Sequence, residues 1–512
     1  MRWKLLGILA FVICTPVATR AEHKESAALA TALDSITLPE IKSHVETLAD
    51  DALEGREAGS RGGRAAGAYL VSQFEKFGLQ PAGDNKTYFQ SFEGNSRNIL
   101  GLMPGADAAL KDQIIVVGAH YDHVGYGSPT NSYGPIGKIH NGADDNASGV
   151  SGLLEMADAL RQMPNPPRRT ILFALWDGEE KGLNGSKHWM KNPTVPVKSI
   201  VFSINTDMIG RLREQGLEVL GTRTMTGLRT KICELNRDYK QVLDFTWTMK
   251  EDSDHWPFFN ANIPVVMFHT GLHKEYHTPR DDAPLINYEG IRSVTRMMTQ
   301  FLYAMATDDE LPAFRMQARK ESDGNKNALE NPNGAPPPRF GMSWKKDETT
   351  GAMVVTQITP ETPAHRAGVR QGDRIVRFNG QPVTDDRTLK LEILYAPKKV
   401  EVVVERDGQE APVPIIVEPR GGPVRVGFSW REDDGEPGVL VVTHVVPHSA
   451  AAMAGFKLAD RVDRVNGQRF TDAKDFMRIV NGVGDKVVLR AERKGVLQDV
   501  TVEMLPAREF SE

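Results

Sequence analysis

Between residues 36 and 306, short apolar runs alternate with segments in which apolar residues recur at helical spacing. Four of the apolar runs are continuous, as expected for strands that are buried on both faces of a largely parallel sheet. These runs span residues 114–119, 170–175, 199–204 and 264–268. The pattern predicts an α/β region whose mixed, largely parallel central sheet is flanked by helices.

The C-terminal part of the chain has a different pattern, with short strand-like runs between Gly and Pro turns, and it repeats itself. Residues 339–344 read Arg-Phe-Gly-Met-Ser-Trp, and residues 425–430 read Arg-Val-Gly-Phe-Ser-Trp. The period is that of a small domain rather than of a solenoid. We therefore expect two copies of one β-rich domain, at 338–420 and 421–507. The polar, Pro-rich residues 308–337 are expected to form a linker.

Potential metal ligands follow each of the four apolar runs, in the order His120, Glu180, Asp207 and His277. A fifth, Asp144, precedes a predicted amphipathic helix. Because ligands bind beyond the carboxyl ends of parallel strands, these residues are expected to meet at one edge of the sheet. Two histidines and three carboxylates suit zinc, and one carboxylate can bridge two ions. The sequence therefore predicts a two-metal site.

The N-terminus is expected to be a cleaved signal peptide over residues 1–21. Arg2 and Lys4 precede an apolar run that ends at Cys14, and small residues follow up to Ala21. The run is shorter than the roughly 20 residues that span a bilayer. We therefore expect no membrane span in the mature chain, and a periplasmic or secreted protein.

Composition and cysteine content narrow the function classes. The 512 residues include 62 basic and 67 acidic ones, a formal net charge of -5, so no basic excess points to a nucleic-acid partner. Cys14 and Cys233 are the two cysteines, and the first lies in the predicted signal. An internal disulfide in the mature chain and a cysteine zinc site are therefore excluded.

The α/β region resembles the aminopeptidase branch of the M28 family of co-catalytic zinc peptidases. Five blocks typical of that family occur in order: His-x-Asp at 120–122, Gly-Ala-Asp-Asp-Asn-Ala-Ser-Gly at 142–149, Glu-Glu at 179–180, Asp-Met at 207–208 and His-Thr at 277–278. The stretch Leu-Glu-Gly-Arg-Glu-Ala-Gly at 53–59 is also similar to the family's N-terminal part. The resemblance implies a zinc-exopeptidase fold over residues 22–307, without the lid insertion that many relatives carry, and a peptide substrate.

The resemblance also implies a ligand set for two Zn²⁺ ions per chain. Asp144 is expected to bridge both ions. Glu180 and His277 would complete one site, and His120 and Asp207 the other.

Three further residues receive catalytic roles from the same resemblance. Glu179 is expected to be the general base that activates a metal-bound water and then the acid that protonates the leaving amine. Asp122 would orient the ring of His120. Tyr276 is a candidate to hydrogen-bond the developing oxyanion.

The C-terminal repeats resemble PDZ domains of bacterial proteases. Residues 340–342 and 426–428 stand where that family has its carboxylate-binding loop. The resemblance implies that the domains recruit substrate or a partner by binding protein or peptide C-termini. The second copy has Ala459 where the first has Gly372, and alanine tolerates a left-handed turn less well than glycine. We therefore expect the second copy to be less regular at this turn.

Other functions remain open at this point. A carboxypeptidase or a glutaminyl cyclase of the same family is one alternative, and a PDZ scaffold with a vestigial peptidase is another. A cyclase of this type needs one metal ion. A carboxypeptidase needs basic residues in its pocket, and the sequence does not place the four candidates, Arg211, Arg213, Arg223 and Arg280.

Overall fold

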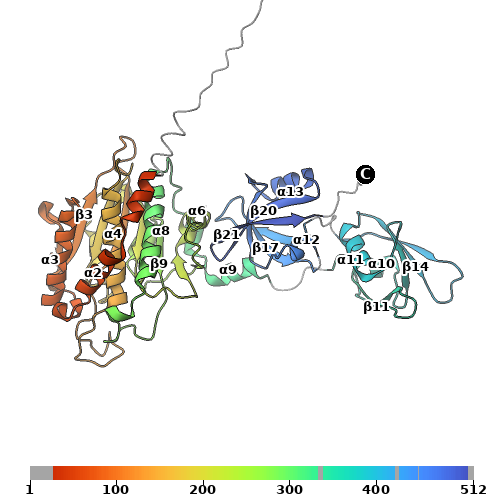
Figure 1. Ribbon diagram of the computed structural model, residues 1–512, viewed down its shortest axis with the longest axis horizontal. Helices are drawn as coiled ribbons and strands as arrows, with labels where there is room; N and C mark the ends of the chain where they lie inside the picture. The colour runs from red at the N-terminus through yellow and green to blue at the C-terminus, as the bar shows by residue number, and fades with distance from the viewer. Residues whose placement is uncertain (1–26, 333–337, 421–425, 448, 505–512) are drawn as a thin grey trace, which may run out of the picture. The chain divides into compact units, whose positions relative to one another are not determined.

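The computed structural model describes residues 27–332, 338–420, 426–447 and 449–504 (Figure 1). The predicted signal peptide lies outside these residues. The chain divides into two compact units. The first contains the residues up to Met225 together with Asp238–Arg319, and the second contains Thr226–Arg237 together with the chain from Lys320 onwards.

The first unit is built on one nine-stranded sheet. Its strands are β1 (Gln80–Pro81), β2 (Phe89–Phe92), β3 (Ser96–Met103), β4 (Ile114–His120), β5 (Thr170–Trp176), β6 (Ile200–Thr206), β7 (Leu217–Leu220), β8 (Leu243–Thr246) and β9 (Val265–His269). Their order is β1-β3-β5-β4-β6-β9-β7-β8, and β2 pairs with β3. The four predicted buried runs are the adjacent strands β5, β4, β6 and β9, which pair in parallel. The predicted mixed, largely parallel sheet is confirmed.

Helices cover both faces of this sheet, because alternate residues of its central strands point to opposite sides. The helices are α2 (Leu38–Leu48), α3 (Arg61–Lys76), α4 (Gly149–Arg161), α5 (Asn184–Lys191), α7 (His255–Asn260) and α8 (Tyr288–Thr307). On one face, Trp176 of β5 packs against Trp189 of α5 and Phe258 of α7. On the other, Phe202 and Phe268 contact Phe301 of α8. Helices α2, α4 and α8 pack against one another, as Figure 1 shows.

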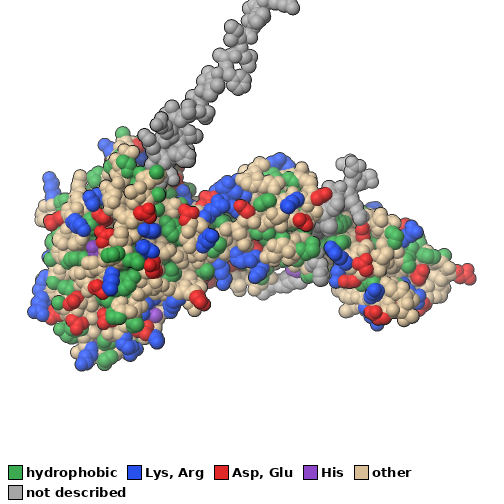
Figure 2. Space-filling model, in the orientation of Figure 1, with side chains coloured by type: hydrophobic (Ala, Val, Ile, Leu, Met, Phe, Trp, Pro, Cys, Tyr) green, Lys and Arg blue, Asp and Glu red, His purple; other side chains and the backbone are tan. Residues whose placement is uncertain are grey.

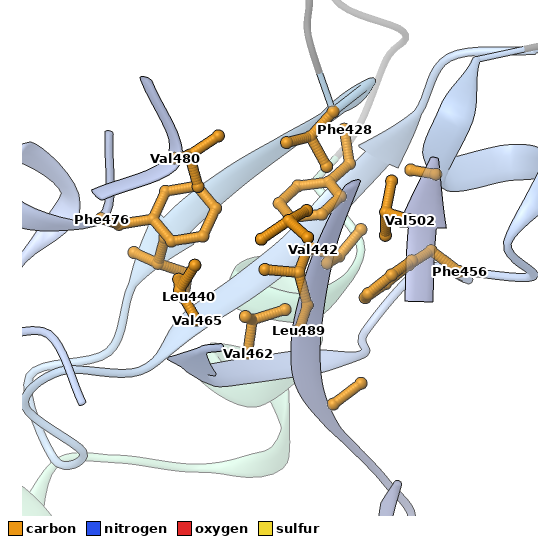
Figure 3. Packing of buried hydrophobic residues seen from close by; sticks show 14 of the residues in the cluster. Phe428, Leu440, Val442, Phe456, Val462, Val465, Phe476, Val480, Leu489 and Val502 are labelled. Atoms are coloured by element: carbon orange, nitrogen blue, oxygen red, sulfur yellow. The ribbon is translucent and has the colours of Figure 1, made fainter. Parts of the chain in front are cut away.

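The second unit contains two sheets with the same strand order, which confirms the predicted repeat. The first copy consists of β10 (Met342–Lys346), β11 (Met353–Ile358), α10 (Pro363–Ala367), β12 (Arg374–Phe378), β13 (Gln381–Pro382), α11 (Asp386–Tyr395), β14 (Val400–Glu405) and β15 (Val413–Val417). The second consists of β16 (Phe428–Glu432), β17 (Leu440–Val445), α12 (Ala450–Met453), β18 (Arg461–Val465), β19 (Gln468–Arg469), α13 (Ala473–Gly482), β20 (Lys486–Arg493) and β21 (Val496–Glu503). Each copy has its own apolar core. Figure 3 shows that of the second, where Phe428 packs against Phe456 and Phe476.

The turn expected to be irregular in the second copy keeps the geometry of the first. Gly372 has a φ of 92° and Ala459 a φ of 68°, so both are left-handed. The expectation of a less regular turn is therefore wrong. The surrounding β17 and β18 hold Ala459 in a conformation that its Cβ disfavours.

One helix of the second unit comes from the middle of the predicted peptidase range. Helix α6 (Leu228–Leu235) lies between β7 and β8 in the chain but packs against β21. The side chain of Glu436 accepts hydrogen bonds from the backbone N–H groups of Arg229 and Thr230, at 2.9 and 3.0 Å, and so caps the start of the helix. The Arg229 guanidinium donates to Glu492 at 2.9 Å.

The expected linker contains secondary structure, a helical turn at Met316–Arg319 and helix α9 (Asp323–Glu330).

Within the described ranges, no helix is long and apolar enough to cross a membrane. On the face drawn in Figure 2, Lys and Arg side chains of the first unit lie among Asp and Glu side chains and form no continuous basic surface.

Candidate metal centre

Histidines and carboxylates gather at one edge of the large sheet. His120 ends β4, Glu179 and Glu180 follow β5, and Asp207 follows β6. These three strands are parallel neighbours, so their carboxyl ends meet at the same edge. His277 reaches this edge from the loop after β9. Four of the five predicted ligands are therefore brought together.

The side chains form two groups with metal-site spacing that share one carboxylate. One group contains His123, Asp145, Glu180 and His277, and the other contains His120, Asp145 and Asp207. Asp145 Oδ2 lies 3.0 Å from His277 Nε2, and its Oδ1 lies 3.3 Å from His120 Nε2. A carboxylate with one oxygen turned to each group suits the bridge of a two-metal site.

The shared carboxylate is not the one that the sequence predicted. Asp144 Oδ1 instead accepts hydrogen bonds from the backbone N–H of Gly210, at 2.6 Å, and from the Ser148 hydroxyl, at 3.0 Å. Its Oδ2 lies 3.2 Å from His273 Nε2. The prediction of Asp144 as the bridging ligand is therefore corrected to Asp145, because the turn sends the two neighbouring side chains to different partners.

His123 was missed by the sequence analysis. Its Nδ1 lies 2.7 Å from Glu180 Oε1, and its buried Nε2 has no hydrogen-bond partner among the described residues. The signal that could have identified it is its place three residues after His120, at the end of the same strand-to-loop segment.

The three residues predicted to have catalytic roles lie around the same groups. The Glu179 backbone N–H donates to Asp122 Oδ1 at 3.0 Å, which ties the two segments together. The Nδ1 of His120 lies 3.2 Å from the Asp122 carbonyl oxygen and 3.8 Å from its carboxylate. Tyr276 stacks on the ring of His277, with ring centroids 3.8 Å apart.

The charges of this cluster fit bound cations. Four carboxylates, Asp145, Glu179, Glu180 and Asp207, lie among three histidines, and within the described part of the chain none of the four pairs with Lys or Arg. Burying uncompensated carboxylates is costly. Divalent metal ions would supply the missing positive charge, and nitrogen and oxygen ligands suit zinc.

The same surroundings shift the pKa values of the groups. Burial alone would lower the pKa of His120, but the Asp207 and Glu179 carboxylates raise it well above its ordinary value. Burial raises the pKa of Glu179 well above its ordinary value, although His120 opposes the shift. Burial also opposes ionisation of Asp145, but His123 and His120 hold its pKa well below the usual range.

A cavity of about 290 Å³ opens beside the cluster. It is lined by His120, Asp145, Glu179, Asp207 and Tyr276. The lining also includes apolar and polar side chains, among them Met208, Glu218, Leu220, Thr246, Lys250, Met267 and His269. The cavity can thus hold a side chain next to the cluster.

Residues 98–302 match the profile described as peptidase family M28, and residues 338–417 and 424–504 match the PDZ domain. Residues 98–302 belong to peptidase family M28. All residues of the two ligand groups lie inside this M28 region, and the two PDZ matches coincide with the two copies of the repeat.

Two curated relatives each match a part of the chain. Aminopeptidase YwaD of Bacillus subtilis is 30% identical over 227 residues, which cover 42% of this chain and 46% of the relative. A probable periplasmic serine endoprotease DegP-like of Marinomonas is 28% identical over 174 residues, which cover 30% and 37%. The chain thus spans less than half the length of these two relatives.

Solved structures similar to the chain include zinc aminopeptidases. Legionella LapA matches with a TM-score of 0.46 at 21% identity, over 55% of this chain and 77% of that one. BSAP, a zinc aminopeptidase from Bacillus subtilis, matches with a TM-score of 0.44 at 18% identity, over 54% of this chain and 96% of that one.

Proposed function

We propose that the protein is a two-zinc aminopeptidase that removes N-terminal residues from peptides. The observation that carries the proposal is the pair of ligand groups sharing Asp145, with Glu179 beside them in the lining of a cavity. Membership of the M28 family supports the same conclusion.

The residues of the two groups would hold the ions, one between His123, Asp145, Glu180 and His277 and the other between His120, Asp145 and Asp207. When bound, zinc supplies a Lewis acid that polarises a peptide carbonyl and lowers the pKa of water. Glu179, which lines the cavity beside both ligand groups, would take the proton of the attacking water and pass it to the leaving amine. Asp122 holds Glu179 through the backbone N–H bond. The Tyr276 hydroxyl is the candidate donor to the oxyanion.

The four candidate arginines bear on whether the site could serve a carboxypeptidase. Arg211 pairs with Asp281 at 3.0 Å, and Arg213 donates to the carbonyl oxygens of residues 270–272. Arg223 stacks on Trp247, with 4.0 Å between its guanidinium carbon and the ring centroid. Neither these three nor Arg280 lines the cavity. Lys250 does line the cavity, so a carboxypeptidase would have to hold the terminal carboxylate by that lysine rather than by a bidentate guanidinium.

We infer that the PDZ domains recruit substrate or partner proteins by their C-termini. Strands β10 and β16 are edge strands, to which an extended peptide can add. Gly341 and Gly427, in the loops before these strands, have φ values of 80° and 100°. A Cβ at Gly341 would collide with Thr362, and a Cβ at Gly427 would collide with Ser449. Recruitment would raise the local concentration of substrate at the peptidase.

We also propose that the protein is exported to the periplasm or secreted. The support is the signal-like pattern of residues 1–21. N-terminal sequencing of the mature protein from fractionated cells would test cleavage after Ala21.

The function is tested with the full chain loaded with zinc. We expect it to release the first residue of a peptide that has a free N-terminus, and to do so equally when the C-terminus is amidated. Acetylation of the N-terminus should stop the reaction. Release of the last residue instead would contradict the proposal, and formation of pyroglutamate with one zinc per chain would favour a cyclase.

The role of Glu179 is tested by Glu179→Gln, which keeps the shape but removes the base. General acid–base catalysis contributes roughly 10²–10⁴-fold to the rate, so kcat should fall at least about 100-fold. The zinc content should stay at two per chain. Turnover close to that of the unaltered protein would remove Glu179 from its assigned role.

A further inference from the structure

Arg56 carries a buried charge whose hydrogen bonds go to backbone carbonyl groups. Its side chain is 1% exposed, and no carboxylate forms an ion pair with it among the residues that the structure describes. The guanidinium instead donates to four backbone carbonyl oxygens, those of Leu48 at 2.5 Å, Asn141 at 2.5 Å, Tyr121 at 2.9 Å and Gly142 at 3.0 Å. Burying an arginine without an ion pair is costly, and the charges of the nearby Asp145 and Asp122 offset this cost in part.

Three of these carbonyl groups belong to the segments that carry the metal-site residues. Tyr121 stands between His120 and Asp122. Asn141 and Gly142 lead directly into the helical turn Ala143–Ser148, which contains Asp145. One planar group therefore contacts both the segment that presents His120 and the segment that presents the shared carboxylate.

The backbone around Arg56 is adapted to this position. Glu54, Gly55 and Arg56 all have left-handed φ values, of 51°, 68° and 50°. A Cβ on Gly55 would lie 2.5 Å from the carbonyl oxygen of His140, so only glycine fits. The carbonyl oxygen of Arg56 accepts from the backbone N–H of His123 at 3.3 Å. Consecutive left-handed residues cost energy, and such strain persists where the surrounding contacts fix it.

We propose that Arg56 is a positioning residue of the metal centre, which fixes the His120–His123 segment against the Asn141–Asp145 segment. The inference rests on the proposed metal site but not on the identity of the substrate. The guanidinium reaches both segments at once because it offers five N–H donors in a rigid plane, whereas an ammonium group offers three at a single point.

The test compares two buried arginines in the full chain. Arg169 is also 1% exposed and also donates to backbone carbonyl oxygens, those of Met305 at 3.2 Å and Asp308 at 2.5 Å, but it lies at the start of β5, opposite to the metal centre. Arg56→Lys and Arg169→Lys each keep the positive charge but replace the planar guanidinium with an ammonium group. Zinc affinity is measured by competition with a chelator, and the absorption spectrum of the cobalt-substituted protein reports ligand geometry.

We expect Arg56→Lys to bind zinc about 10–100-fold more weakly, the usual effect of losing a group that orients metal ligands, with an altered cobalt spectrum. Arg169→Lys should lower the melting temperature but leave zinc affinity and the spectrum unchanged. If Arg56→Lys fails to fold, Arg56→Gln is measured in the same way. Unchanged affinity and spectrum in a folded Arg56 variant would overturn the inference, and so would equal weakening by Arg169→Lys. Failure of the unaltered chain to bind zinc would overturn the proposed metal site together with this inference, whereas zinc binding without peptidase activity would overturn only the proposed activity.

Discussion

The carboxylates of Asp144 and Asp145 adjoin in the chain but point to different partners. Asp145 turns its oxygens towards His277 and His120, at 3.0 and 3.3 Å. Asp144 accepts from the backbone N–H of Gly210 at 2.6 Å. The backbone N–H groups of both residues donate to Asp281 Oδ2, at 2.9 and 3.0 Å. Asp281 thus holds the backbone of both residues, while their carboxylates leave it towards different partners.

The first prediction separates these two residues. Asp145→Asn removes the charge shared by both ligand groups, so we expect the zinc content after dialysis to fall from two per chain towards zero. Asp144→Asn is the matched control. It should keep both ions but melt at a lower temperature, because the bond to Gly210 weakens when the acceptor is no longer charged. Loss of zinc from Asp144→Asn with retention by Asp145→Asn would restore the assignment made from the sequence.

The second prediction concerns the pH dependence of stability. Burial, followed by the nearby Glu40 and Asp158 charges, raises the pKa of Glu155 on α4 from 4.5 to about 8. The folded state thus favours the protonated form, and the stability that this proton provides is present at low pH and is lost as the pH rises towards 8. Glu155→Gln has no proton to lose. Its stability relative to the unaltered protein should therefore increase between about pH 5 and pH 8, measured by denaturant unfolding. A difference that is independent of pH would contradict the assignment.

The third prediction concerns the buried ion pair that joins α6 to the second PDZ domain. Arg229 and Glu492 have side chains 9% and 7% exposed. Removing one partner of such a pair leaves the other charge buried and uncompensated, so Arg229→Met should destabilise the second unit by about 3–5 kcal/mol. Arg478→Met is the control, because Arg478 is 69% exposed beside Asp475 and should cost at most about 1 kcal/mol. Hydrogen exchange of residues 486–503 measures both, and equal effects would show that the pair contributes no more than a surface one.

The fourth prediction uses the left-handed turn that both PDZ domains share. Ala459→Gly relieves the strain of an alanine at a φ of 68° and should stabilise its domain by about 1 kcal/mol. Gly372→Ala should destabilise the first domain by a similar amount. A Cβ at Gly372 would meet no atom within 4 Å, so the change reports backbone conformation alone. Unfolding midpoints in denaturant check both, and opposite signs of the two effects are required.

Much of the first unit could be predicted because its central strands are buried on both faces. Continuous apolar runs are the signature of such strands, and each prediction of this kind corresponds to one of β4, β5, β6 and β9. The ends of these runs then located His120, Glu179, Glu180 and Asp207 at one edge. The repeat was readable because two copies of one domain repeat the same turns and core positions.

The fold class, the two PDZ copies and the strand ends that carry the candidate ligands could be read from the sequence, since burial and periodicity are local patterns. The choice between Asp144 and Asp145 required the three-dimensional contacts, because adjacent carboxylates have the same chemistry and Asp281 and Gly210, far along the chain, fix their directions. The tertiary structure likewise added His123 and assigned α6 to the second unit. These outcomes depend on contacts between residues distant in sequence, which no local pattern encodes.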